Sequence, residues 1–399
     1  MELLLPQSLA EAADMVAAAL AEERPISVLG QGGKLGLGQP AAQPTGLSTR
    51  RLSGITLYEP GELVLSCGAG TPLAEIEATL AERQQQLAFE PPDASSWYGA
   101  APGQATMGGV FATNLAGPRR FKAGAPRDHL LGVQCVTGRG EAIKTGGRVV
   151  KNVTGYDLCK LLAGSFGTLA VMGHVTFKVL PAPECTQTLA IFGEDLADLA
   201  ARMRKAAGTA FEISGAALLP AKAAGRSEVD ALARAQTAVA LLRVEGVRPS
   251  VEDRMQGLIG EVVGKGLPHL VLAEESIALW QRLRDLRVLP DRPVLWRLSV
   301  APTEGVAAAK ALLGLGADLF LDQVGGQIFA VMDDPRAAEV RALVAGGGHA
   351  TLLRAPDAIR RTIPVFQPQP APLAALAARV KNAFDPRQIL EPGRMTLAA

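Results

Sequence analysis

The chain has few cysteines and histidines, two residue types that commonly bind metals or transfer protons. Its 399 residues include only four cysteines and four histidines. No two cysteines form a C-x-x-C pair, which argues against an iron–sulfur cluster or zinc site built from this chain alone, and no metal is expected. Widely spaced cysteines in a reducing compartment are expected to be small buried residues, here Cys67, Cys135, Cys159 and Cys185.

Excess charge and long apolar segments are also missing. The 40 Lys and Arg residues balance 39 Asp and Glu residues, so no global field attracts nucleic acid, and none is expected as a partner. The uncharged run Leu161–Phe177 is interrupted by glycines and a histidine, and a spanning helix needs ~20 mostly apolar residues. Residues 1–6 hold no basic segment, unlike a signal peptide. We therefore expect a globular intracellular protein of two or three domains without a transmembrane segment.

Two glycine-rich stretches stand out, Gly30–Gly38 and Pro102–Asn114. Glycine lets backbone amides approach an anion closely, so two such loops predict a large phosphorylated cofactor held at two places. The first loop follows an expected strand, Ile26–Leu29. It is not a Rossmann fingerprint or a P-loop, because Leu35 and Val28 stand where those motifs need glycine. The alternative for this loop is a glycine-rich surface turn.

Local patterns predict several elements of the first half. Ser8 can cap a helix whose apolar residues repeat at helical spacing. A strand pair is expected within Leu57–Gly70, followed by a helix with Thr71 as cap and Pro72 at its first position. A third segment, Lys151–Leu169, should hold a short helix that Gly164 ends, with a strand running on to Val179.

The second half has a different composition. A helix is expected from Leu196 to Ala207, and strands at Ala238–Val244, Leu295–Val300 and Gln327–Met332. This alternation is typical of an α+β domain. The C-terminal helix Pro372–Ala383 should pack back on the rest of the chain through one apolar face, made by Leu373, Leu376, Val380 and Phe384.

The two glycine loops and the third segment together resemble the FAD-binding domain of the vanillyl-alcohol-oxidase or PCMH type. The resemblance implies an α+β protein with a two-lobed FAD-binding domain at 1–181 (subdomains about 1–55 and 56–181), an α+β cap domain at 182–350 and a C-terminal segment at 351–399. A further match lies near the end, at Phe384–Arg387 and Pro392–Arg394.

In that family the first loop wraps the FAD pyrophosphate, the second runs beside the diphosphate and flavin, and the third segment lies near one end of the cofactor. The resemblance therefore implies FAD contacts at Gly30, Gln31, Gly32, Gly33, Lys34, Leu35, Pro102, Gly103, Thr106, Gly108, Gly109, Thr113, Asn114, Ser165, Gly167 and Thr168. Some members bond the flavin through a histidine or cysteine. Lys34 and Gln104 occupy those positions here, so FAD should be held non-covalently.

The sequence offers little for catalysis. Oxidation of a 2-hydroxy acid needs a base and a partner for the carboxylate, and the histidine-containing cap motif of complete dehydrogenases of this family is missing around Asp322–Phe329. His349 could be a base or a solvated turn residue. Arg297 could bind a carboxylate, with Trp296 as a stacking surface, or both could be ordinary strand residues. His174 could also serve as the base of a self-sufficient dehydrogenase, or be a packed strand residue.

An intact flavin domain with a thin catalytic cap resembles the E-type FAD-binding subunits of bacterial glycolate oxidases. The resemblance implies oxidation of glycolate to glyoxylate in a complex with a larger FAD-containing catalytic subunit and an iron–sulfur subunit. It also implies a cytoplasmic location, at the inner membrane face if the complex docks there. Two alternatives remain: a self-sufficient FAD-dependent 2-hydroxy-acid dehydrogenase, and a scaffold subunit that binds no flavin.

Overall fold

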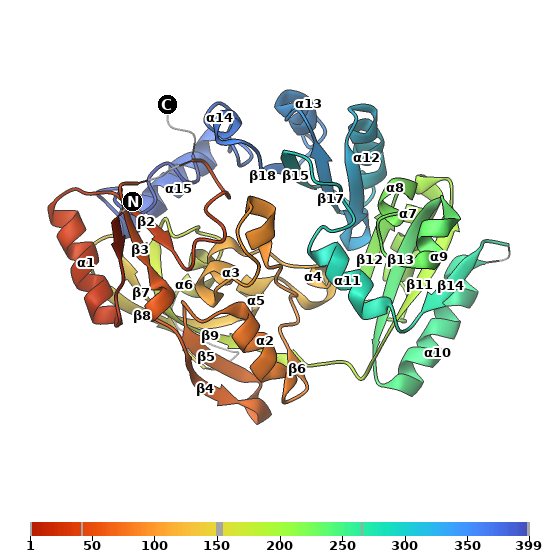
Figure 1. The fold of residues 1–399 in the computed structure, drawn as a ribbon, viewed down its shortest axis with the longest axis horizontal. Coiled ribbons are helices and arrows are strands. Elements are labelled where there is room, and N and C mark those ends of the chain that lie inside the picture. Colours follow the sequence, from red (N-terminus) through yellow and green to blue (C-terminus); the bar gives the residue numbers. More distant parts are fainter. Residues whose placement is uncertain (1, 41–42, 149–154, 265, 397–399) are drawn as a thin grey trace. The chain divides into compact units, whose positions relative to one another are not determined.

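The computed structural model describes residues 2–40, 43–148, 155–264 and 266–396 (Figure 1). The start of the third sequence segment, Lys151–Thr154, lies outside the described residues. The chain divides into two compact units. The first comprises residues 1–116, 124–182 and 360–399, and the second residues 117–123 and 183–359.

The first unit contains two main sheets. A three-stranded parallel sheet has the order β1-β3-β2, from strands β1 (Glu2–Leu4), β3 (Thr45–Ser48) and β2 (Ile26–Leu29). A five-stranded antiparallel sheet has the order β4-β5-β9-β7-β8, from β4 (Ile55–Glu59), β5 (Val64–Gly68), β9 (Ala170–Lys178), β7 (Leu130–Thr137) and β8 (Ala142–Gly146). The helices of this unit include α1 (Leu9–Ala21), α2 (Leu73–Ala81), α3 (Met107–Thr113), α5 (Pro126–His129), α6 (Leu158–Leu162) and α15 (Ala371–Phe384).

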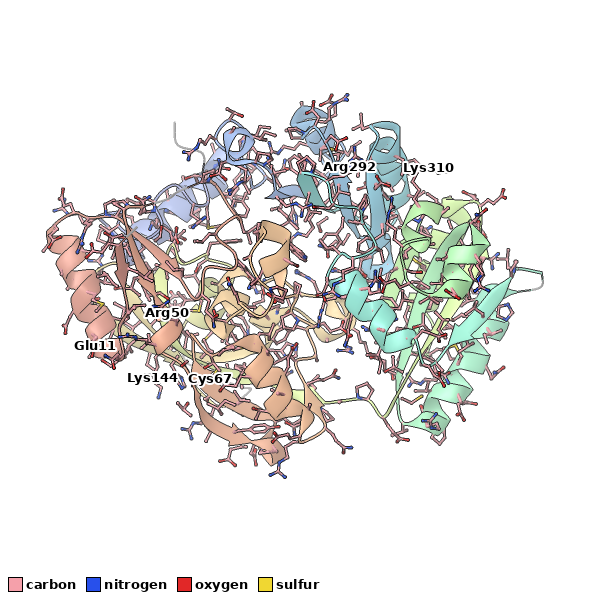
Figure 2. All side chains as sticks on the ribbon, in the orientation of Figure 1. Glu11, Arg50, Cys67, Lys144, Arg292 and Lys310 are labelled. Carbon is pink, nitrogen blue, oxygen red and sulfur yellow. The ribbon has the colours of Figure 1, made fainter. Side chains whose placement is uncertain are left out.

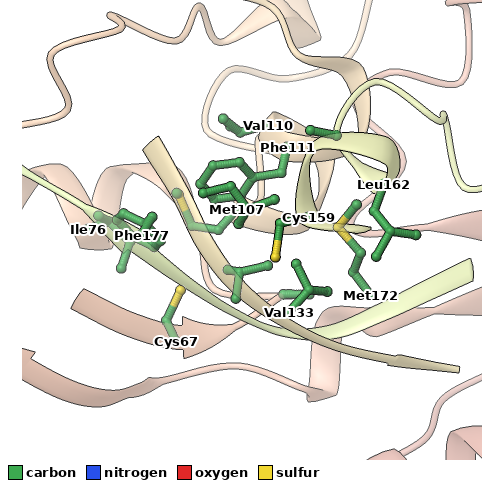
Figure 3. Packing of buried hydrophobic residues seen from close by; sticks show 14 of the residues in the cluster. Cys67, Ile76, Met107, Val110, Phe111, Val133, Cys159, Leu162, Met172 and Phe177 are labelled. Carbon is green, nitrogen blue, oxygen red and sulfur yellow. The ribbon is translucent and has the colours of Figure 1, made fainter. Parts of the chain in front are cut away.

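The larger of two hydrophobic clusters in this unit includes helix α3. Figure 3 shows Phe111 and Met107 of α3 packing with Phe177 and Met172 of β9. All four cysteines are unpaired and buried, as the sequence predicts. Burial raises the pKa of Cys67 to about 12, so its thiol stays protonated at neutral pH.

Most of the local predictions for this unit are confirmed. Helix α1 is capped by Ser8, whose Oγ accepts a hydrogen bond from the Glu11 amide at 3.1 Å. One cap is wrong: α2 begins at Leu73, with Pro72 at the cap position and no side-chain cap. The Thr71 hydroxyl instead accepts from the Gly54 amide at 2.9 Å and donates to the Gly68 carbonyl at 2.8 Å, so a tertiary contact takes the group that could have capped the helix.

Helix α15 packs only through its second half. Val380 and Phe384 lie against the core of the first unit. Leu373 and Leu376, expected on the same packed face, are 54% and 47% exposed. The apolar periodicity therefore identifies the helix correctly but overstates the length that is covered.

The second unit is built on an eight-stranded sheet of order β14-β11-β13-β12-β16-β17-β15-β18, with every pairing antiparallel. Its strands are β14 (His269–Leu272), β11 (Cys185–Gly193), β13 (Ala238–Gly246), β12 (Gly215–Leu219), β16 (Asp318–Asp322), β17 (Gln327–Met332), β15 (Val294–Ser299) and β18 (His349–Arg354). The longer helices are α7 (Leu196–Ala207), α10 (Arg248–Leu258), α11 (Ser276–Arg284) and α12 (Gly305–Gly314). The expected helix at Leu196–Ala207 is confirmed as α7.

Several ion pairs involve residues of this sheet. Arg119 makes two hydrogen bonds to the Glu245 carboxylate, at 2.8 and 3.0 Å, and both side chains are nearly buried. Buried Arg243 lies 3.6 Å from the same carboxylate and stacks over Trp280. Although burial opposes ionisation, the two guanidinium groups lower the pKa of Glu245 to about 2. Nearer the other edge, Arg292 (Figure 2) pairs with Asp318 of β16 and with Asp333, which directly follows β17.

Candidate cofactor cavity

The first unit contains a cavity that both glycine loops line. Of the residues expected to contact FAD, the cavity is lined by Gly30, Gln31, Gly32, Gly33, Lys34, Leu35, Thr106, Gly108, Gly109, Thr113 and Gly167. Segments from three parts of the sequence therefore meet at one place.

Five of the expected residues are not among those lining the cavity: Pro102, Gly103, Asn114, Ser165 and Thr168. The cavity is also lined by residues that the motifs did not predict as contacts: Val28, Leu29, Leu37, Thr49, Gln104, Ala112, Phe166, Ala170, Met172, Glu391 and Arg394. Most of these residues lie beside or within the expected motifs, so their position in the sequence could have identified them as further contacts. Arg394 belongs to the Pro392–Arg394 match to the family, which carried no expected contact, and Glu391 directly precedes that match.

The first loop leaves β2 with its backbone amides available. Within the described part of the chain, the amides of residues 31–34 donate no hydrogen bond to a protein group. The loop's own bonds begin later, from the Leu35 amide to the Gly32 carbonyl at 3.2 Å and from the Leu37 amide to the Lys34 carbonyl at 3.0 Å. Gly32 has φ +86°, a conformation that glycine adopts without strain. A run of unused amides beside a cavity is a binding surface for an anion.

Two glycines of the first loop lie directly against neighbouring segments, Gly30 against the second loop and Gly33 against Ser95. A Cβ atom on Gly30 would overlap the Thr106 hydroxyl, and one on Gly33 would overlap the Ser95 hydroxyl. The second loop is itself anchored, because the Gly108 amide donates to the Ala69 carbonyl at 2.7 Å. Glycine in the first loop is therefore what allows the two segments to approach.

The polar side chains of the second loop serve helix α3. Thr106 caps α3 through a 3.4 Å bond from the Gly109 amide, and the Thr113 hydroxyl donates to the Gly109 carbonyl at 2.8 Å. Asn114 ends the helix in the left-handed conformation, and its Oδ1 accepts from the Arg127 amide at 2.9 Å. Asn114 therefore orders the end of α3 and lies outside the cavity lining.

Lys34 is the cationic side chain of the first loop. Burial lowers its pKa to about 8, and the Asp93 carboxylate counteracts part of this shift. A Cβ on Gly109 would lie 3.6 Å from Lys34 Nζ, so the ammonium group sits beside the second loop. Asp93 accepts from the Ser95 hydroxyl at 2.6 Å and from the Gly103 amide at 2.5 Å. Gly103 thus supports the site through Asp93.

The third segment makes a tight turn beside α3. The Phe166 amide donates to the Ala112 carbonyl at 2.9 Å, and Phe166 holds a positive φ of 55°. Its ring lines the cavity and meets Phe366 edge-on at 5.0 Å. The neighbouring Ser165 is buried, and its hydroxyl has no hydrogen-bond partner among the described residues.

The catalytic candidates lie on the sheet of the second unit. His349 begins β18 opposite Ser299, and Arg297 of β15 lies opposite Thr351. Burial, with Arg297 and Arg120 nearby, lowers the pKa of His349, so the neutral ring is favoured.

Trp296 and His174, also named as candidates, have structural contacts. Trp296 is fully buried and donates from Nε1 to the Pro335 carbonyl at 2.8 Å, so it offers no exposed stacking surface. His174 lies in β9 with its Nε2 2.6 Å from the Thr56 hydroxyl, in agreement with a packed strand residue. The Gln323–Gly325 turn joins β16 to β17.

Comparison with solved structures defines the class. The fold matches p-cresol methylhydroxylase with a TM-score of 0.73 and 15% identity, covering 99% of this chain and 88% of that chain. It matches alkyldihydroxyacetonephosphate synthase with a TM-score of 0.68 and 16% identity, covering 98% and 75%. Residues 2–146 match the family model described as FAD binding domain. The fold is therefore that of the PCMH-type flavoproteins.

Sequence similarity is more specific. The chain is 32% identical over 387 residues to the glycolate oxidase subunit GlcE of Escherichia coli (strain K12), covering 96% of this chain and 95% of that protein. The chain belongs to the family of this glycolate oxidase subunit, within the FAD-linked 2-hydroxy-acid oxidoreductases. It is also 35% identical to a D-lactate dehydrogenase of Archaeoglobus fulgidus, over 43% of this chain and 37% of that protein. No helix in the described ranges is both long and apolar enough to cross a membrane.

Proposed function

We propose that this chain is an FAD-binding subunit of a glycolate-oxidising complex. The observation that carries the proposal is the cavity between the two glycine loops, with unused amides at residues 31–34 and Lys34 beside them. These groups fit the diphosphate of FAD, because several amides and one cation can share its charge.

Different lining residues would contact different parts of the cofactor. The first loop and Lys34 would hold the diphosphate, while Phe166, Ala170 and Met172 supply apolar surface for a ring system. When bound, FAD would supply the acceptor for the electrons removed from a 2-hydroxy acid. The cavity-lining Lys34 and Gln104 lack the histidine or cysteine chemistry of covalent attachment, so the cofactor should be released when the protein is denatured. Yellow colour on the precipitated chain would contradict this.

The proposed partners are a larger FAD-containing catalytic subunit and an iron–sulfur subunit. Similarity over nearly the whole length to a protein named as a glycolate oxidase subunit supports this assignment. A 38% identical region is also shared with a second glycolate oxidase subunit, GlcD of Bacillus subtilis, over 33% of this chain and 26% of that protein. The proposed electron path runs from glycolate through flavin to the iron–sulfur partner.

A self-sufficient 2-hydroxy-acid dehydrogenase is the second candidate function. The placement of His349 and Arg297 on adjacent strands favours it, because a neutral imidazole can accept a proton and a guanidinium can bind a carboxylate. A scaffold subunit without flavin is the third candidate.

An anaerobic glycolate titration of the FAD-loaded chain, followed by flavin absorbance, separates these functions. The complex-subunit proposal predicts an unchanged oxidised spectrum for the chain alone and bleaching once the partner subunits are added. Bleaching of the lone chain, lost in His349→Ala, would establish the self-sufficient dehydrogenase. A folded chain that cannot be loaded with FAD would establish the scaffold.

A further inference from the structure

Both ends of the first glycine loop are held by residues 389–395, far along the chain. At the start of the loop, the Ile26 amide donates to the Ile389 carbonyl at 2.7 Å, and the Glu391 amide donates to the Ile26 carbonyl at 2.9 Å. The next donor, the Val28 amide, bonds to Glu391 Oε1 at 2.8 Å. Two backbone hydrogen bonds therefore join residues 389–391 to Ile26, and the Glu391 carboxylate accepts the third bond, from Val28, just before the loop begins.

Arg394 holds the end of the same loop. Its Nη1 donates to the carbonyls of Leu35 and Leu37, each at 3.1 Å. Its own carbonyl accepts from the Gln39 amide at 2.9 Å. The stretch between these anchors contains the unused amides of the cavity.

Glu391 and Arg394 are also bound to each other. Arg394 Nε donates to Glu391 Oε2 at 3.1 Å, and the two side chains are 8% and 1% exposed. Both line the cavity. Because the guanidinium already serves the carboxylate and two carbonyls, its contacts place the loop, and the unused amides remain available for an anion.

A loop with so many glycines has little stiffness of its own. Without anchors it would lose conformational entropy whenever a ligand ordered its amides, and affinity would fall accordingly. The buried ion pair fixes both ends before the ligand arrives. Such a pair is costly to break, because removing one partner leaves the other charge buried and uncompensated.

We propose that Glu391 and Arg394 form a positioning pair that preorganises the first glycine loop for the diphosphate of a flavin dinucleotide. This inference rests on the proposed function, since it assumes that the cavity binds FAD. The pair contributes through the loop backbone, so its loss should weaken FAD binding as well as destabilise the fold.

The test measures FAD affinity and thermal unfolding of the full-length apoprotein in matched variants. Arg394→Met should raise the Kd for FAD by about tenfold or more. Arg394→Lys should restore part of the affinity, because an ammonium group can reach some of the same acceptors. Glu391→Gln keeps an oxygen for the Val28 amide and loses the ion pair, so its Kd should lie between those of the wild type and Arg394→Met.

Arg119→Met is the matched control. It breaks a similar nearly buried ion pair, Arg119 with Glu245, in the unit that does not contain the cavity. It should lower the unfolding temperature and leave the Kd for FAD within twofold of the wild type. The positioning role would be overturned if Arg394→Met bound FAD with the wild-type Kd. It would also be overturned if Arg119→Met raised the Kd for FAD as much as Arg394→Met does.

Two further outcomes are decisive. If Arg394→Met does not fold, Arg394→Lys and Glu391→Gln carry the test, and wild-type affinity in both would overturn the inference. If the wild-type apoprotein itself binds no FAD while remaining folded, the proposed function fails and the inference fails with it.

Discussion

Replacing Lys34 by methionine should weaken FAD binding in a pH-dependent way. Lys34 lies in the first glycine loop, lines the cavity and has a pKa of about 8 because burial disfavours its charged form. A hydrogen bond to a charged group contributes about 1.5–3 kcal/mol, and 1.4 kcal/mol corresponds to a tenfold change in Kd. Lys34→Met should therefore raise the Kd at pH 7 by about 10- to 100-fold.

The sign of the pH effect follows from the charge of the ligand. The diphosphate is an anion, so it binds better to the protonated lysine. With a pKa of about 8, about nine-tenths of Lys34 is protonated at pH 7 and about 3% at pH 9.5. The wild-type affinity should thus fall by up to about 30-fold between these pH values, and Lys34→Met should lose this dependence.

The assay is a fluorescence titration of apoprotein with FAD at both pH values, with thermal unfolding measured alongside. Lys144→Met is the control, since Lys144 is an exposed lysine on β8 of the same unit (Figure 2) and is not among the cavity-lining residues. It should retain the wild-type pH profile. The same pH profile in Lys34→Met as in the wild type, or a change in Kd below about threefold at pH 7, would refute the reasoning.

Two other predictions concern stability. Gly30→Ala should destabilise the first unit by about 1–3 kcal/mol, because the new Cβ overlaps the Thr106 hydroxyl, whereas Gly61→Ala meets no atom within 4 Å and should stay close to the wild type; equal urea midpoints for the two variants would contradict this. The pKa of Glu245 is lowered to about 2, so its contribution is present above its ordinary pKa and is lost as pH falls toward 2. Glu245→Gln should cost about 3 kcal/mol at pH 7 and little at pH 2, and urea unfolding that shows the same pH dependence in both proteins would rule out this role.

Several elements could be predicted because their signals are local. The Ser8 cap, the strand before the first glycine loop and helix α7 depend on residues within one or two turns of each other, and the structure contains all three. The glycine loops were recognisable for the same reason, since their composition reflects a backbone requirement at those positions.

The failures occur where a distant segment competes for the same group. Threonine is a common helix-capping residue, yet the Thr71 hydroxyl hydrogen-bonds to the backbone of Gly54 and Gly68. Leu373 and Leu376 continue a helical apolar pattern, yet they are exposed. Only Val380 and Phe384, in the second half of the helix, pack against the core. Periodicity defines a face of a helix and does not define the length of its neighbour.

The sequence by itself determined the two glycine loops and the phosphorylated ligand that they predict, because these depend on backbone freedom over short stretches. The type of fold followed from the resemblance of these motifs to a known family. Only the tertiary structure decided which residues surround the cavity. It brings Leu390 beside Ile26 in a parallel bridge and so places Glu391 and Arg394 against the loop. Contacts between segments so far apart in sequence depend on the packing of every element between them, which no local pattern records.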